Sequence, residues 1–250
     1  MHILPPLDIT ALAFFLLAWG GYAIAVEWGP GSGTGLNARM HDYRDIWMHR
    51  ALHRELRMFD AQIMAALQNG TAFFASTSLL AIGGGLTMLR ATNEINTVIE
   101  NLQVGEPPTA AKWEVKAAGL ILILVYAFFK FAWAYRLYNY VAIMLGAMPP
   151  ASERASAEAE RHVLRTTKLF ESAGRHFNRG QRAFFFALGY LGWFAGPWPL
   201  MVSTTAVVVV MWRRQFASAA QRALTAEVPE KVPAGGPETA PTISPRGDKR

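Results

Sequence analysis

Residues Ala117–Met148 read AAGLILILVYAFFKFAWAYRLYNYVAIMLGAM, an apolar run interrupted by Lys130 and Arg136. A helix that crosses the roughly 30 Å hydrocarbon core of a bilayer needs about 20 apolar residues, so this run is long enough to cross. Further apolar runs occupy residues 9–26, 71–89 and 183–212. Together the four runs predict an all-α, polytopic helical membrane protein.

The composition supports the membrane class and excludes several kinds of chemistry. Of 250 residues, 52% are hydrophobic and eight are Trp, more than the core of a soluble domain needs. The absence of Cys excludes disulfides, thiolate metal sites and cysteine nucleophiles. No dinucleotide fingerprint, phosphate-binding loop or nucleophile arrangement occurs. We therefore expect no catalytic residues and no cofactor.

The fourth apolar run contains the sequence Gly196-Pro197-Trp198-Pro199. Proline removes a backbone donor and clashes with the preceding turn, so this tetrapeptide predicts a break that turns the run into a hairpin and adds a fifth crossing. Each limb would be short for a crossing, and a single long kinked helix is the alternative.

The positive charges agree with the hairpin. With it, nineteen Lys and Arg residues fall on one side of the membrane and three on the other. The positive-inside rule then places the basic connections and the C-terminus in the cytoplasm and the N-terminus outside, in a cell inner membrane. Because Lys and Arg flank apolar runs, we expect anionic lipid headgroups as their partners, and no nucleic acid.

The chain divides into a helical membrane domain, residues 1–225, and a tail, residues 226–250. The tail is rich in Pro, Glu and Gly, a composition that predicts disorder. The N-terminal residues 1–8 carry no Lys or Arg, so residues 9–26 are interpreted as a retained membrane anchor, not a cleaved signal.

Polar residues in the third run are the first candidate site. Tyr126 and Lys130 share one helix face, and Arg136 and Asn139, three residues apart, lie on an adjoining face. A charge deep in hydrocarbon marks a position that faces the bundle or a pathway, whereas a charge near a helix end anchors at the interface. If Arg136 faces the bundle with Asn139, replacing it by Ala should cost more stability than Lys130→Met.

Acidic partners for these charges are few. No Asp or Glu lies within an apolar run, and the nearest are Asp8 and Glu27 at the two ends of the first run. A proton-relay pump would need a membrane-embedded carboxylate, which this chain does not show.

Small residues mark the second run. They let a neighbouring helix approach closely, so we expect tight helix packing here, and the alternative is a broken helix that exposes carbonyl groups to a substrate. These residues are Ser76, Ser78, Gly83, Gly84 and Gly85.

The connection 40–68 looks helical and places His49 and His53 four residues apart, a spacing that two metal ligands can use, with Asp45 as a third candidate. The surrounding arginines repel a cation, so we expect no metal there. The connection 152–182, with Ser152 as its expected N-cap, predicts a second amphipathic cytoplasmic helix.

Several short stretches resemble a proteobacterial family of membrane proteins catalogued as domain of unknown function 599. The resemblance covers about residues 5–225 and implies an integral membrane protein, without supplying a catalytic residue, cofactor or substrate. The stretches are residues 73–80, 135–140 and 181–188, followed by 196–198.

Two function classes follow from these observations. The first is a non-enzymatic membrane scaffold or accessory subunit, with another membrane protein or a second copy as its partner. The second is a small transporter or channel that uses Lys130 and Arg136 to receive an anionic solute or lipid. A membrane-bound enzyme is a third, less supported class. A cavity that reaches Lys130 or Arg136 from water would favour transport, and a dry core would favour the scaffold.

Overall fold

The computed structural model describes residues 4–29, 35–90, 109–218, 220 and 223–224. Within these ranges the protein is all-α and contains no strand. The expected disordered tail lies outside the described residues. The elements are α1 Pro6–Trp28, α2 Leu36–Leu52, α3 Met58–Arg90, α5 Ala110–Gly146, the 3₁₀ turn η1 Ala151–Glu153, α6 Ala157–Tyr190, α7 Gly192–Ala195 and α8 Pro197–Phe216.

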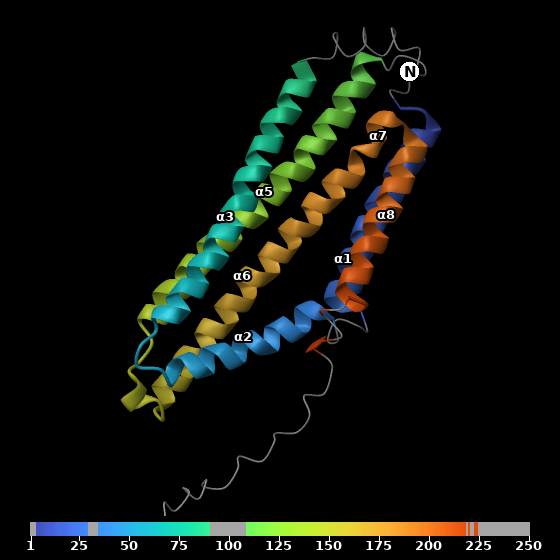
Figure 1. The fold of residues 1–250 in the computed structure, drawn as a ribbon. Coiled ribbons are helices and arrows are strands. Elements are labelled where there is room, and N and C mark those ends of the chain that lie inside the picture. Colours follow the sequence, from blue (N-terminus) through green and yellow to red (C-terminus); the bar gives the residue numbers. More distant parts are fainter. Residues whose placement is uncertain (1–3, 30–34, 91–108, 219, 221–222, 225–250) are drawn as a thin grey trace, which may run out of the picture.

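The helices form one elongated bundle (Figure 1). Helices α3, α5 and α6 run beside one another, with α5 packed against both of the others. Helices α1 and α8 pair beside the upper half of α6, and α2 lies obliquely below their lower ends. Three helices, α1, α3 and α5, are long and apolar enough to cross a membrane. The predicted class, an all-α helical membrane protein, is confirmed.

Helix α3 meets α5 through small and apolar residues at heptad spacing. Met64, Thr71, Ser78 and Gly85 are all buried at seven-residue intervals along one face of α3. A Cβ atom at Gly85 would come within 2.7 Å of Ile121 Cγ1, so only glycine allows this approach. This strict period is typical of two helices that stay in contact over many turns.

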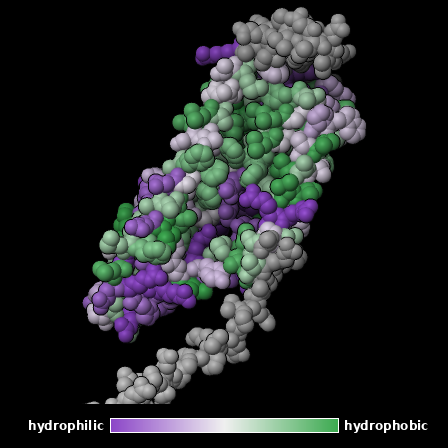
Figure 2. Space-filling view, viewed as in Figure 1, coloured by the Kyte–Doolittle hydropathy of each residue, from purple (hydrophilic) through white to green (hydrophobic). Residues whose placement is uncertain are grey.

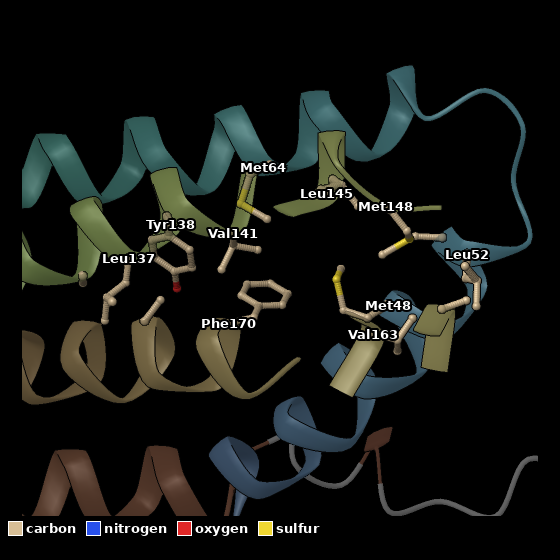
Figure 3. Packing of buried hydrophobic residues seen from close by; sticks show 14 residues of the cluster. Met48, Leu52, Met64, Leu137, Tyr138, Val141, Leu145, Met148, Val163 and Phe170 are labelled. Atoms are coloured by element: carbon tan, nitrogen blue, oxygen red, sulfur yellow. The ribbon is translucent and has the colours of Figure 1, made fainter. Parts of the chain in front are cut away.

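The lower half of the bundle has its own apolar core, called here the lower core (Figure 3). It joins α2 to the lower parts of α3, α5 and α6, and Phe170 of α6 lies at its centre. Its buried residues are Met48, Ala51, Leu52, Met64, Ala134, Leu137, Tyr138, Val141, Leu145, Met148, Ala159, Val163, Phe170 and Ala173.

The upper half is packed mainly by aromatic rings. Phe15 of α1 makes edge-to-face contacts with Phe186 and Tyr190 of α6, and Trp19 stacks on Phe186 with ring centroids 5.6 Å apart. The hydropathy of the surface also differs between the two halves. On the face shown in Figure 2, hydrophobic residues predominate in the upper part, and hydrophilic residues gather at the lower end and below α1 and α8. The apolar exterior therefore belongs to the upper half, which α1, α8 and the upper parts of α3, α5 and α6 form.

The fourth apolar run is divided between the end of α6, α7 and α8. The helix breaks at Gly196, whose φ of 135° is a conformation that favours glycine, and α8 begins with Pro197 at its first position. A Cβ atom at Gly192 would lie 2.7 Å from the Pro199 carbonyl oxygen, so this glycine allows α8 to fold back closely.

Two expected helix boundaries are wrong. The connection 40–68 is not one helix, because the chain breaks between α2 and α3 and residues 58–68 continue into α3. The connection 152–182 begins at Ala157 instead, since Ser156 accepts a hydrogen bond from the Ala159 amide at 3.1 Å. Helix α6 then runs without interruption into the fourth apolar run.

The break between α2 and α3 contains neither Gly nor Pro and is held by side chains. The Arg57 guanidinium donates to the carbonyl oxygens of Ala51 at 3.1 Å, Met148 at 3.1 Å and Pro149 at 2.7 Å. Ala51 lies in the last turn of α2, and Met148 and Pro149 follow the end of α5, where carbonyl groups have few backbone donors. Tertiary hydrogen bonds thus override the local helix propensity.

We predict that Arg57→Ala lowers the free energy of unfolding by about 2 to 3 kcal/mol, because three carbonyl groups lose a charged donor. Thermal unfolding in mild detergent, followed by fluorescence-detected size exclusion, measures the change. Arg50→Ala removes the same charge from an exposed position and should change the midpoint little. Equal losses for the two variants would contradict this role of Arg57.

Candidate functional site

Three charged side chains join α1 to α6 near the end of α1. The Arg179 guanidinium donates from Nε to Glu27 Oε1 at 3.0 Å and from Nη2 to Oε2 at 2.6 Å, a bidentate pair. Arg182 donates from Nη2 to Oε1 of the same carboxylate. Because Arg179 and Arg182 are three residues apart on one helix, they project from the same face. We call Glu27, Arg179 and Arg182 the ion triad.

A cavity of about 650 Å³ lies beside the ion triad and is called here the arginine cavity. Its walls come from the end of α1, the first turns of α2 and the middle of α6. Its lining residues are Val26, Glu27, Trp28, Asn37, Ala38, His41, Asp42, Arg175, Asn178, Arg179 and Arg182.

A smaller cavity of about 130 Å³ adjoins the arginine cavity and shares Asn178 and Arg182 with it. It continues toward α8, where it is lined by Met211, Arg214 and Gln215. The two cavities together form a polar space at the lower ends of α1 and α8, with four arginines and two carboxylates in its walls.

The surroundings of the arginine cavity are positively charged. At its edge Glu171 contacts His41 at 3.1 Å and Arg175 at 3.6 Å. Next to Arg175, burial lowers the pKa of His176, and the positive charges of Lys130, Arg179 and Arg175 lower it further. Burial, and then the neighbouring positive charges, therefore favour the neutral form of His176.

A second polar cluster lies at the opposite end of α1. The indole Nε1 of Trp193 donates to Asp8 at 2.6 Å, and the Lys116 ammonium donates to the Trp193 carbonyl oxygen at 2.8 Å. All three residues are buried. At 1.5 Å per helical residue, α1 separates the Cα atoms of Asp8 and Glu27 by about 28 Å.

The partners of these two carboxylates on α6 and α7 are closer together than the carboxylates themselves. The Cα atoms of Arg182 and Trp193 are only about 16 Å apart along α6 and α7. The long side chain of Arg182 reaches Glu27 at one end, and the indole of Trp193 reaches Asp8 at the other. The long side chains of Arg182 and Trp193 make up the difference between these two separations.

The structure separates the polar residues predicted from the third run. The Lys130 ammonium lies 5.1 Å from the centre of the Tyr126 ring, and Tyr126 in turn contacts Trp19 of α1. Asn139 accepts a hydrogen bond from Gln68 Nε2 at 2.7 Å, which joins α5 to α3.

Arg136 does not face the bundle. It is exposed and donates from Nε to the Tyr140 hydroxyl at 2.7 Å on its own helix. The expectation that Arg136 and Asn139 act together on one side is therefore wrong. Because Arg136 is exposed, we no longer expect Arg136→Ala to lower the stability of the protein more than Lys130→Met does.

The small residues of the second run lie on two different faces of α3, one buried and one exposed. Ser78 and Gly85 are buried against neighbouring helices, whereas Ser76, Gly83 and Gly84 are exposed. Helix α3 is continuous through them, so no broken helix exposes carbonyls there.

Of the two histidines of the first connection, His49 belongs to the contact between α2 and α6, and His53 bonds back to α2. His49 Nδ1 bonds to the Asp45 carbonyl oxygen at 3.0 Å, and Nε2 lies 3.4 Å from Glu160 of α6. His53 Nδ1 bonds to the His49 carbonyl oxygen at 2.9 Å. In the described part of the chain, no group of three or more His, Asp and Glu side chains is placed to hold a metal ion.

The sequence shows Glu27 as an acidic group at the end of the first apolar run, but it does not bring Arg175, Arg179 or Arg182 to it. A signal was present, because residues 175, 179 and 182 follow the spacing that puts three arginines on one helix face. The spacing alone could not reveal that α1 and the start of α2 close the cavity over this face.

Sequence comparison identifies the family. The family described as protein of unknown function, DUF599, matches residues 10–220. The chain belongs to this family. The resemblance inferred from short stretches is thereby confirmed, and the range matched by DUF599 contains every residue of the arginine cavity. No curated protein and no solved structure matches the chain, so the function must be argued from the geometry.

The arrangement is suited to holding an anion. Guanidinium groups remain protonated and donate in a fixed planar fork that fits carboxylate and phosphate oxygens. They do not exchange protons near neutral pH, so they suit the binding of an anion; the other ionisable groups in the walls of the cavity are the His41 imidazole and the carboxylates of Glu27 and Asp42.

We predict that Arg182→Gln lowers the free energy of unfolding by about 2 kcal/mol, because the Glu27 carboxylate loses a charged donor whose side chain is only 9% exposed. Arg213→Gln is the matched control, since Arg213 is exposed near the end of α8. Thermal unfolding in the same detergent compares them. If Arg182→Gln unfolds at the same temperature as Arg213→Gln, the ion triad does not fasten α1 to α6.

Proposed function

We propose that this protein is a non-enzymatic inner-membrane scaffold or accessory subunit. Its upper half would be embedded in the bilayer, and its lower half would project as a rigid helical platform, made of α2 and the lower parts of α3, α5 and α6. The observation that carries the proposal is the lower core, because a bundle that only crossed a membrane would need no second core beyond it.

Two separations support this placement of the bilayer. Asp8 and Glu27 are about 28 Å apart along α1, and Lys116 and Arg136 are about 30 Å apart along α5, both close to the thickness of the hydrocarbon core. Trp133 and Tyr140, exposed beside Arg136, suit the headgroup region, where Trp and Tyr are enriched. Lys130 and Arg136 then act as anchors near one surface.

The positive charges support a cytoplasmic platform. In this arrangement α6 and α8 form the hairpin, both crossing the bilayer, and the nineteen Lys and Arg residues face the cytoplasm. Anionic lipid headgroups would neutralise the arginines around the platform. The N-terminus would lie outside.

The platform ends in an exposed apolar tip formed by Leu56, Met58 and Phe59, with exposed fractions of 81%, 72% and 65%. The tip lies at the start of α3, far from the proposed bilayer surface. Exposed apolar groups in such a position are typical of a contact with another protein. The partner would be a membrane-associated protein or a second copy of this chain.

Site-specific photocrosslinking in native membranes tests the scaffold. A benzophenone amino acid at Leu56 or Phe59 should give discrete protein adducts, whereas the same group at Phe129, exposed on the apolar half of α5, should give lipid adducts. If the protein is a transporter instead, vesicles that contain the purified protein should take up anions. Absence of protein adducts at the tip, together with anion uptake by vesicles containing the purified protein, would replace the scaffold with a transporter.

A further inference from the structure

The ion triad already shows how the arginine cavity recognises an anion. Arg179 holds the Glu27 carboxylate through two parallel hydrogen bonds, and Arg182 adds a third. Bidentate guanidinium recognition of this kind applies equally to carboxylate and phosphate oxygens. The chain's own carboxylate therefore occupies a cradle that suits a phosphate group.

Donors remain in the cavity for a second anion. Among the described residues, Arg182 donates from Nη2 alone and Arg179 from Nε and Nη2, so each keeps N–H groups for a ligand. Arg175 adds a further guanidinium in the wall, with 58% of its side chain exposed.

The start of α2 adds to the positive potential. Asn37 and Ala38, in the first turn of α2, line the cavity, and this turn carries no acidic residue. The amides of Ala38 and Arg39 donate to the Gly35 carbonyl oxygen, and the helix dipole places partial positive charge at this end of α2. A helix N-terminus combined with arginines is a recurrent phosphate site.

The size and position of the cavity indicate what carries the phosphate. A volume of about 650 Å³ exceeds that of a lone phosphate and falls in the range of small-molecule pockets. The adjoining cavity of about 130 Å³ is lined by Tyr22, Phe185 and Met211 together with polar residues, Arg214 and Gln215 among them. A polar head larger than phosphate, such as a glycerophosphate, fits a space of this size and lining.

We propose that the arginine cavity binds the phosphate group of a glycerophosphate, either as the headgroup of an anionic phospholipid or as the free compound, and that Glu27 gives up the arginines when this anion binds. The lipid form rests on the proposed membrane placement, in which the cavity opens at the cytoplasmic headgroup region. The phosphate chemistry rests on the cavity alone.

Native mass spectrometry of the purified protein measures the binding, with phosphatidylglycerol, phosphatidylcholine and free glycerol 3-phosphate as probes. We expect phosphatidylglycerol to bind in preference to phosphatidylcholine. Glu27→Gln should tighten binding about tenfold, because a neutral amide competes less for the arginines. Arg182→Gln should weaken it about tenfold.

Arg175→Gln keeps the proposal testable if Arg182→Gln does not fold, because Arg175 is exposed and takes no part in the ion triad. It should weaken binding about threefold. Arg165→Gln removes the same charge from an exposed position of α6 outside the cavity and should leave binding unchanged. Equal effects of the Arg175 and Arg165 variants, or no tightening by Glu27→Gln, would overturn the site.

The probes separate this proposal from the proposed function. If glycerol 3-phosphate binds with the same dependence on Glu27 and Arg175 but phosphatidylglycerol shows no preference, the phosphate site stands and its ligand is the free compound. If neither probe binds with that dependence, the site is refuted, whatever the crosslinking at the platform tip shows.

Discussion

The thickness of a bilayer constrains this structure more than any single contact. About 20 helical residues cross the hydrocarbon core, yet α3, α5 and α6 contain 33, 37 and 34 residues. Helices of this length that share one bundle must extend beyond the membrane. Outside it they can be stable only if they bury apolar surface against each other, and the lower core provides that burial.

The same constraint accounts for where the charges lie. Buried ions are costly in hydrocarbon unless they are paired, and two clusters of paired polar groups lie near the two ends of α1. Asp8 meets Trp193 at one end, and Glu27 meets Arg179 and Arg182 at the other. In the proposed placement of the bilayer, the arginine cavity lies near a bilayer surface, where arginines can line it while it still borders an apolar core.

The sequence predicts the helical membrane class and the break at Gly196, since both depend on composition and on local backbone chemistry. It does not predict the break between α2 and α3, because Arg57 makes that break by bonding carbonyl groups at Met148 and Pro149, far along the chain. The ion triad has the same origin, with partners about 150 residues apart. The outward position of Arg136 was missed because two adjoining helix faces could not be told apart before packing was known.

Thiol accessibility along α5 tests the central claim, that one continuous helix is half in the bilayer and half in water. The chain contains no Cys, so single replacements at Leu122 and Ile143, exposed by 69% and 66%, report on one position each. In inside-out vesicles, a membrane-impermeant maleimide should label Ile143→Cys and leave Leu122→Cys unlabelled. Equal labelling of the two positions would contradict the account.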